Sequence, residues 1–147
     1  MEFNKDSHAI SSINQCKIID LDRHTHENGS LSVVQNTQEF PFEIKRVYYL
    51  YDIPGDAERG GHSHFNEQRL IIAVSGCFDV TVDDGHEIRK FTLNRPYKAL
   101  YIPAGIWRNL DNFSSGSVCL ALASNLYDPE DYVRDYKEFK MLTKNKL

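Results

Sequence analysis

The chain has 147 residues, a length suited to one domain. Its 17 Lys and Arg against 21 Asp and Glu give a formal net charge of −4, which argues against a protein whose main partner is nucleic acid or an anionic membrane. Hydrophobic residues make up 41% of the chain, enough for a core, and the three cysteines lack both the CxxC spacing of a zinc knuckle and the even count of a disulfide framework. No stretch is apolar enough to span a bilayer, and the polar start at residues 1–12 is unlike a signal peptide, so the sequence predicts a cytoplasmic protein.

Short β-favouring segments follow one another along most of the chain. Residues 1–15 are polar and without a period, which predicts a loose N-terminal arm, and residues 22–29 are typical of a turn. Residues 78–82 alternate between apolar and polar, as in a strand with one solvated face, and Asp83-Asp84-Gly85 predicts a hairpin turn after it. This spacing favours an all-β sandwich or barrel. The predicted strands are residues 16–19, 31–34, 45–51, 68–74, 77–82, 88–93, 99–102 and 117–123.

Residues 128–141 carry the pattern of a short C-terminal helix. Asp128 suits the N-cap, Pro129 the first helical position, and the acidic residues after it the positive end of the helix dipole. We therefore expect a single domain over residues 1–147, a small barrel followed by this helix. The apolar face that would pack on the barrel consists of Tyr132, Val133, Tyr136 and Phe139.

The segment 59–67, Arg-Gly-Gly-His-Ser-His-Phe-Asn-Glu, carries the most chemistry. His62 and His64 lie two residues apart, so in an extended stretch they share a face. Two converging imidazoles can begin a metal site or a general-base site. Spacing alone equally fits two solvated histidines on a glycine loop, which is the favoured interpretation of the second pair, His24 and His26.

Two glycine-containing motifs frame the middle of the chain. The first is residues 61–64 (Gly-His-Ser-His) with Glu67 and Gly76, and the second is residues 103–109 (Pro-Ala-Gly-Ile-Trp-Arg-Asn). Together they resemble the two motifs of the cupin superfamily, which implies a double-stranded β-helix, or jelly-roll, barrel. Metal-binding cupins have a histidine in the second motif where this chain has Arg108, and a guanidinium binds phosphate or carboxylate rather than a divalent ion. We therefore expect neither a metal nor another cofactor.

Seven segments in order narrow the resemblance: residues 44–49, 59–64, 78–80 leading to 83–85, 100–103, 106–108, 111–115, and 122–124 leading to 127–128. They are similar to the sugar nucleotide 3,4-ketoisomerases that act on dTDP-4-keto-6-deoxyglucose, which are relatives of the RmlC-type sugar epimerases. The resemblance covers about residues 18–139 and implies a homodimer, as does the open barrel edge that the strand pattern predicts.

The resemblance implies a proton-transfer reaction. The keto group moves from C4 to C3 as a proton leaves C3, an enediol(ate) forms and a proton returns at C4. By similarity His62 is the base and Tyr48 its partner, and His64 is a second candidate, for moving protons between the two oxygens. The product would pass to a PLP-dependent aminotransferase, for deoxyaminosugars of surface polysaccharide such as lipopolysaccharide O-antigen or of glycosylated metabolites.

Cationic and aromatic residues are candidates for binding the dTDP-sugar. Arg46, Arg59 and Arg108 could bind the diphosphate or the enediolate, although Arg46 fits a plain surface charge equally well. Tyr101 and Trp107 could line the pocket or stack on thymine, but aromatic residues on strands more often belong to the core.

Two positions that separate glucose-like from galactose-like products align with Asn28 and Arg108. The Trp107-Arg108 pair resembles the glucose type, whereas Asn28 matches neither type. Three alternatives stay open: a 3- or 5-epimerase of the same keto sugar, a metal-dependent cupin oxygenase, and a non-catalytic sugar-binding cupin.

Overall fold

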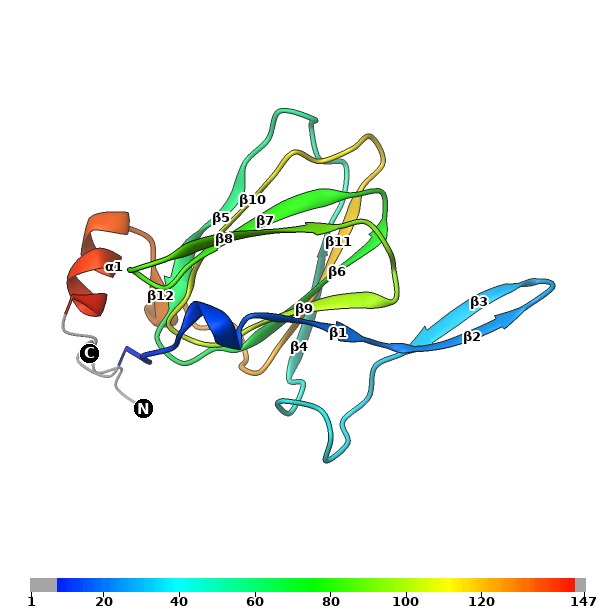
Figure 1. Cartoon of the computed structure of the whole chain (residues 1–147), viewed down its shortest axis with the longest axis horizontal. Helices are drawn as coiled ribbons and strands as arrows, with labels where there is room; N and C mark the ends of the chain where they lie inside the picture. Colours follow the sequence, from blue (N-terminus) through cyan, green and yellow to red (C-terminus); the bar gives the residue numbers. More distant parts are fainter. Residues whose placement is uncertain (1–7, 145–147) are drawn as a thin grey trace.

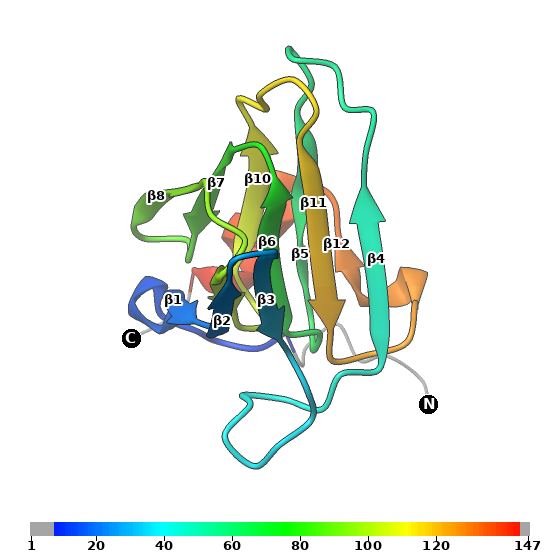
Figure 2. The same cartoon turned by 90° about the vertical axis from the view of Figure 1, so that its right-hand side faces the viewer.

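The computed structural model describes residues 8–144 and shows two five-stranded antiparallel sheets packed face to face, with a separate two-stranded hairpin (Figures 1 and 2). The predicted all-β fold with a short C-terminal helix is confirmed. The first sheet has the order β1-β9-β6-β11-β4, with β1 Lys17–Asp20, β9 Lys98–Ile102, β6 Arg69–Ser75, β11 Val118–Ala123 and β4 Arg46–Leu50. The second has the order β12-β5-β10-β7-β8, with β12 Tyr132–Val133, β5 Arg59–His64, β10 Trp107–Asp111, β7 Phe78–Asp83 and β8 Ile88–Leu93.

Strand β6 contains a continuous run of apolar residues because both of its faces are buried. Its side chains alternate, so Ile71 and Ala73 enter the core between the sheets, while Leu70 and Ile72 enter a second cluster on the outer face. That cluster includes Phe42 from the segment before β4, which covers the sheet. With both faces buried, the strand needs no polar alternation. In the part of the chain that the structure describes, no helix is long and apolar enough to cross a membrane.

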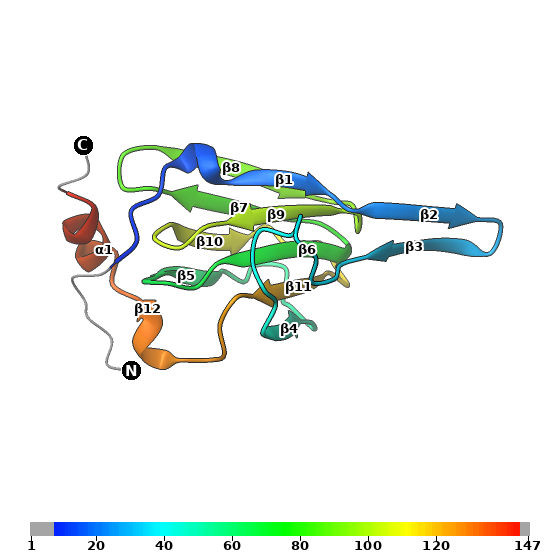
Figure 3. The ribbon, with the colours of Figure 1, turned by 90° about the horizontal axis from the view of Figure 1, so that it is seen from below.

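The segment predicted as a turn over residues 22–29 instead begins a β-hairpin. Strand β2 (Asp22–His26) pairs with β3 (Gly29–Val33), and the hairpin projects from the body of the molecule (Figures 1 and 3). The predicted strand at residues 31–34 overlaps β3 and is confirmed there, whereas all five residues of β2 are polar and exposed, so the sequence shows no apolar period that would reveal that strand. His24 and His26 lie on this hairpin and are solvated, as predicted.

The C-terminal helix is shorter than predicted. Asp128 does act as an N-cap, accepting a hydrogen bond from the Glu130 amide, but it caps only a 3-10 turn, η3 (Pro129–Asp131). The chain then extends as β12, and the α-helix α1 (Tyr136–Thr143) begins after a second cap, Asp135. Pairing of β12 with β5 satisfies the backbone of Tyr132 and Val133, and this tertiary gain outweighs the helical periodicity of the sequence.

The predicted loose arm is wrong for residues 8–15, while residues 1–7 lie outside the described part of the chain. His8, Ser11 and Ile13 are buried against the barrel. The hydroxyl of Ser11 donates to the Ala104 carbonyl at 2.7 Å, and the Ile13 amide donates to Asp84 at 2.8 Å. Specific polar contacts anchor this segment, and they leave no periodic signature in sequence.

Gly105 allows the arm to lie close to the turn between β9 and β10. Its φ is +81°, and a Cβ there would lie 2.0 Å from the Ala9 carbonyl oxygen. We expect Gly105→Ala to lower the free energy of unfolding by clearly more than Gly116→Ala, as measured by urea denaturation. Gly116 is the matched control, since its φ is +74° but a Cβ would meet nothing within 4 Å, leaving only the backbone strain of about 1–2 kcal/mol. Equal losses in the two variants would show that the arm is not held tightly at this point.

Candidate active site

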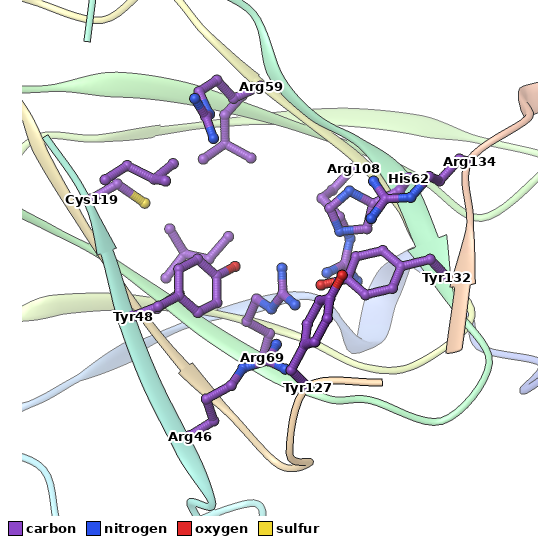
Figure 4. Close-up of a pocket in the computed structure, with 14 residues that line it drawn as sticks. Arg46, Tyr48, Arg59, His62, Arg69, Arg108, Cys119, Tyr127, Tyr132 and Arg134 are labelled. Carbon is purple, nitrogen blue, oxygen red and sulfur yellow. The ribbon is translucent and has the colours of Figure 1, made fainter. Parts of the chain in front are cut away.

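A cavity of about 430 Å³ lies between the two sheets (Figure 4). Its walls come from strands β4, β5, β6, β10 and β11 and from the segment that follows β11. The strand period of two decides which side chains line it, since every second residue of a strand points to the same face. The lining residues are Arg46, Tyr48, Leu50, Arg59, His62, Arg69, Ile71, Arg108, Leu110, Cys119, Ala121, Tyr127, Tyr132 and Arg134.

His62 lies in the cavity wall with an unengaged ring nitrogen. It is 8% exposed, and its Nε2 is buried with no hydrogen-bond partner among the residues described. Burial, together with the positive charges of Arg108, Arg69 and Arg134, lowers the pKa of His62 to about 2. The imidazole is therefore neutral at physiological pH, and its free nitrogen can accept a proton from a molecule in the cavity.

Arg108 lies directly beside His62, because the two residues are paired across strands β10 and β5. Its guanidinium is fully buried, with Nε donating to the Ile106 carbonyl at 3.2 Å. Both Nη atoms are buried without a hydrogen-bond partner within residues 8–144. Burial lowers the pKa of Arg108 to about 10, so it is charged at neutral pH. A buried cation with two free donors at a cavity is a site for an anion.

Tyr48 faces His62 and Arg108 from the opposite wall (Figure 4). Burial raises the pKa of its phenol, an effect that the positive charges of Arg69 and Arg108 partly offset. Arg69 lies 5.1 Å from the centre of the Tyr48 ring. Within residues 8–144 the structure gives no hydrogen bond between Tyr48 and His62, and the two side chains line the cavity from opposite sides.

Three further arginines give the cavity a strong positive charge. Arg46 pairs with the buried Glu67 at 3.0 Å and is only 17% exposed, which excludes the interpretation as a plain surface charge. Arg59 and Arg134 are exposed and line the cavity, where they remain open to a ligand. Together with Arg69 and Arg108, they make the cavity suited to a polyanion such as a diphosphate.

His64 does not line the cavity. It is 1% exposed and lies behind His62, with their ring centroids 4.8 Å apart and the rings nearly perpendicular. Both of its nitrogens are occupied, Nδ1 by Asp131 at 3.3 Å and Nε2 by Arg69 at 3.0 Å. Burial, with Arg108 and Arg69, lowers its pKa well below the usual value. The expected exchange of protons between His64 and substrate has no open path here.

Three sequence-predicted binding residues lie outside the cavity. Tyr101 is on the outer face of the first sheet, where its hydroxyl donates to Gln68 at 2.6 Å and its ring stacks on Phe42. Trp107 packs under α1, with ring centroids 5.6 Å from Phe139. Both side chains pack in hydrophobic clusters, as the sequence analysis expected more often of aromatic residues on strands. Asn28 lies in the turn between β2 and β3 and does not line the cavity of its own chain.

Several cavity residues were not identified from the sequence. Arg69 begins the apolar run of β6, and a charge at that point of a buried strand was a usable signal. The sequence gave no such signal for Tyr127, Tyr132 and Arg134. The last two fall within the predicted helix, whereas the structure places them in and beside strand β12. Asp131 was assigned to the helix dipole rather than to a buried contact with His64.

No group of three or more His, Cys, Asp or Glu residues within the described part of the chain is arranged to hold a metal ion. Arg108 occupies the place beside His62 where the second cupin motif would supply a further ligand. A guanidinium cannot serve as one, because it has no lone pair to give.

The two buried histidines predict acid lability. Their folded-state pKa values lie below the ordinary value near 6.5, so the unfolded chain binds more protons below that pH. The pKa of Asp131 is raised to about 6, so between about pH 4 and 6 the folded chain binds one more proton at this carboxyl than the unfolded chain does. This cancels the contribution of one of the two histidines. One net proton remains, so the free energy of unfolding should fall by about 1.4 kcal/mol per pH unit below pH 6.

Urea denaturation at pH 7 and pH 5 measures this slope, and His62→Gln should flatten it by removing one of the two histidines. A slope that is unchanged in His62→Gln would show that His62 keeps an ordinary pKa in the folded protein.

Comparison with known proteins identifies the family. The family model described as "FdtA: WxcM-like, C-terminal" matches residues 14–144. A curated TDP-4-oxo-6-deoxy-alpha-D-glucose-3,4-oxoisomerase of Aneurinibacillus thermoaerophilus is 37% identical over 124 residues, which cover 84% of this chain and 89% of the relative. The solved TDP-quinovose 3,4-ketoisomerase WlaRB of Campylobacter jejuni is 43% identical, with a TM-score of 0.83 over 88% of this chain and 99% of that one.

The TDP-fucose-3,4-ketoisomerase WlaRA of Campylobacter jejuni is also similar, at 37% identity and a TM-score of 0.84 over 89% of this chain and 97% of its own. The family expected from the sequence motifs is thereby confirmed. The chain, with its imidazole and buried guanidinium side by side in the cavity, belongs to the FdtA family of TDP-sugar 3,4-ketoisomerases.

Proposed function

We propose that this protein converts dTDP-4-keto-6-deoxyglucose to a dTDP-3-keto-6-deoxyhexose. The observation that carries the proposal is the cross-strand pair of His62, with a free buried nitrogen, and Arg108, with two free donors. A ketoisomerase needs a base for the carbon-bound proton and a cation for the oxyanion that results, and this pair supplies both. The relatives are named for this reaction on TDP-linked sugars.

The reaction steps follow from the placement of these groups. The neutral imidazole of His62 removes the proton from C3, and the electron pair moves through the new C3–C4 double bond onto the C4 oxygen. Arg108 stabilises the resulting enediolate. The O3 proton then leaves as the C3 carbonyl forms, C4 takes up a proton, and the C4 oxygen becomes a hydroxyl without any net change in charge.

Tyr48 is the group we propose for the oxygen protons. Its phenol lies across the cavity from His62, and its raised pKa keeps it protonated and able to donate at neutral pH. Arg59 and Arg134, exposed at the cavity, are proposed to bind the diphosphate. Neither role requires a metal or a redox group, since the C4 carbonyl itself acidifies the C3 proton.

We favour a glucose-like configuration at C4 of the product. The Trp107-Arg108 pair supports it, as in the sequence comparison above, and the 43% identical relative is named for quinovose. A relative named for fucose is 37% identical, and the C4 coupling constants in the experiment below distinguish the two configurations. The product is a ketone suited to a PLP-dependent aminotransferase, and that partner remains a prediction.

The decisive experiment is NMR of dTDP-4-keto-6-deoxyglucose incubated with the purified protein in D₂O. A ketoisomerase yields a 3-keto sugar with deuterium at C4, and the coupling constants give the C4 configuration. An epimerase instead keeps the ketone at C4 with deuterium at C3 or C5. Unchanged substrate with folded protein would overturn the proposal and leave the sugar-binding alternative.

We also propose a homodimer. The β2–β3 hairpin is exposed along its whole length, and β4 is an edge strand of the first sheet, with no pairing partner on its outer side among residues 8–144. Three large apolar side chains, Val47, Tyr49 and Tyr51, are more than half exposed on and beside that strand. The hairpin of one copy covering this face of a second copy would remove both exposed surfaces from water.

Light scattering coupled to size exclusion should therefore give the mass of two 17.0 kDa chains. Tyr49→Asp should shift the mass toward one chain, because a charge cannot be buried at the interface. Ile88→Asp, an equally exposed apolar position on β8 of the other sheet, is the control and should remain dimeric. A single-chain mass for the unmodified protein at working concentration would contradict the proposal.

A further inference from the structure

A buried polar cluster lies behind His62 and consists of His64, Glu67, Arg69 and Asp131. The Nδ1 atom of His64 is 3.3 Å from Asp131 Oδ2. Its Nε2 atom is 3.0 Å from Arg69 Nη2 and 3.3 Å from Glu67 Oε2. All four residues are at most 3% exposed, so water does not compete for these contacts.

The position of the proton on His64 is not fixed by its Nε2 neighbours. Arg69 can only donate, which favours an unprotonated Nε2, whereas the Glu67 carboxylate can only accept, which favours a protonated Nε2. The two neighbours thus favour opposite tautomers. The Nδ1 side decides between them, because an ionised Asp131 carboxylate can only accept and requires the proton on Nδ1.

Asp131 is itself fixed by the backbone next to the histidine motif. Its Oδ1 accepts from the Asn66 amide at 2.9 Å, and its Oδ2 accepts from the Glu67 amide at 3.1 Å. Its own carbonyl accepts from the Phe65 amide at 2.9 Å. The carboxylate is therefore held with both oxygens aligned, and Oδ2 faces His64.

The orientation of His64 reaches the proposed base through direct ring contacts. His64 lies edge-on to His62, at 4.8 Å between centroids. The ring of Tyr132, the residue after Asp131, lies 4.4 Å from the centroid of His64 and 4.9 Å from that of His62. A rotation of the His64 ring would displace both neighbours, and both line the cavity.

We propose that Asp131 is a positioning residue that fixes His64 as the Nδ1–H tautomer, so that His64 supports the ring of His62 and does not carry protons to or from the substrate. The part concerning His62 rests on the proposed function. The part concerning the tautomer does not, and the two can be tested separately.

The tautomer is measured on the unmodified protein by ¹⁵N NMR of the histidine side chains at pH 7.5, with His64→Gln used to assign its signals. We expect His64 to show a protonated Nδ1 and an unprotonated Nε2, with no titration between pH 6.5 and 9. A protonated Nε2 would overturn the proposal, whatever the activity of the protein is.

The functional part is tested with Asp131→Asn. An amide oriented so that its oxygen still accepts from one backbone N–H would turn its NH₂ group toward His64 Nδ1, and two donors cannot share that contact. We expect His64 to change to the Nε2–H tautomer, with Glu67 as its acceptor. We expect kcat to fall by about 10- to 100-fold, with KM changed by less than threefold, because the cavity arginines are untouched.

Asp128→Asn is the matched control, since Asp128 caps the same η3 turn through the Glu130 amide and does not line the cavity. It should keep the wild-type tautomer and kcat. If Asp131→Asn changes the tautomer but leaves kcat within twofold, support of His62 by His64 is refuted. If kcat falls while the tautomer is retained, the tautomer is not the means by which Asp131 acts. If Asp131→Asn fails to fold, the tautomer in the unmodified protein still decides the first part.

Discussion

Replacing His62 by asparagine is expected to lower kcat by about 10²- to 10⁴-fold, the range that loss of a general base produces. Asparagine keeps a polar side chain of similar size in the cavity wall but has no nitrogen that can take up a proton. The cavity groups proposed to bind the diphosphate, Arg59 and Arg134, are unaffected by this change. TDP should therefore bind to the variant about as well as to the unmodified protein, as measured by calorimetry, while turnover is followed by NMR.

His86→Asn serves as the control for this variant. His86 is an exposed histidine in the turn between β7 and β8 and takes no part in the cavity. Its replacement should leave kcat unchanged. Turnover by His62→Asn within tenfold of the unmodified protein would mean that another group removes the C3 proton, and Tyr48 would be the next candidate.

Arg108→Gln is expected to lower kcat by about 10²- to 10³-fold, because the enediolate would lose its buried cation. The same change should raise the pKa of His62, since the Arg108 charge is the largest electrostatic cause of its depression after burial. The acid limb of the kcat/KM profile should therefore move to higher pH in the variant. An acid limb at the same pH in Arg108→Gln as in the unmodified protein would show that Arg108 does not lower the pKa of His62.

The stability of Arg108→Gln should not fall in parallel with its activity. The guanidinium is fully buried with two unpartnered nitrogens among the residues described, so the folded protein already carries the cost of burying it. Chemical denaturation should show a free energy of unfolding within about 1 kcal/mol of the unmodified protein or above it. Arg89→Gln, which removes an exposed arginine bonded to Asn14, is the control and should change neither property. A large loss of stability in Arg108→Gln would assign Arg108 a structural role instead.

Local sequence patterns were sufficient for several strands of the core, such as β6 and β7, whereas β5 (Arg59–His64) and β10 (Trp107–Asp111) of the second sheet were not among the predicted strands. The alternation over residues 78–82 and the apolar run of β6 reflect a physical requirement, because each side chain of a strand faces either the core or the opposite surface. The turn at Gly85 was equally readable, since its φ of +94° favours glycine. Strands made only of polar residues could not be predicted from an apolar pattern. Strand β2 was missed because all five of its residues are polar and exposed.

Five of the candidate site residues from the sequence lie in the wall of one cavity. His62 and Arg108 line the cavity together, as do Tyr48, Arg46 and Arg59. Their types and order in the chain gave the family, and the family gave the chemistry. Sequence could not show that Tyr48 faces His62 across the cavity, because that relation depends on how two sheets pack.

The sequence by itself determined the all-β class, the family, and the identity of the proposed base and its neighbouring cation. The class follows from the strand period, whereas the family, the proposed base and the cation follow from the resemblance of the motifs to a known family. Only the tertiary structure decided that Tyr101 and Trp107 pack outside the cavity and that Tyr132 and Arg134 join its wall. It also decided that His64 is sealed behind His62 by Asp131. The positions of Tyr132, Arg134 and Asp131 depend on the pairing of β12 with β5, a contact between residues about 70 positions apart, which outweighs the helical preference of the segment.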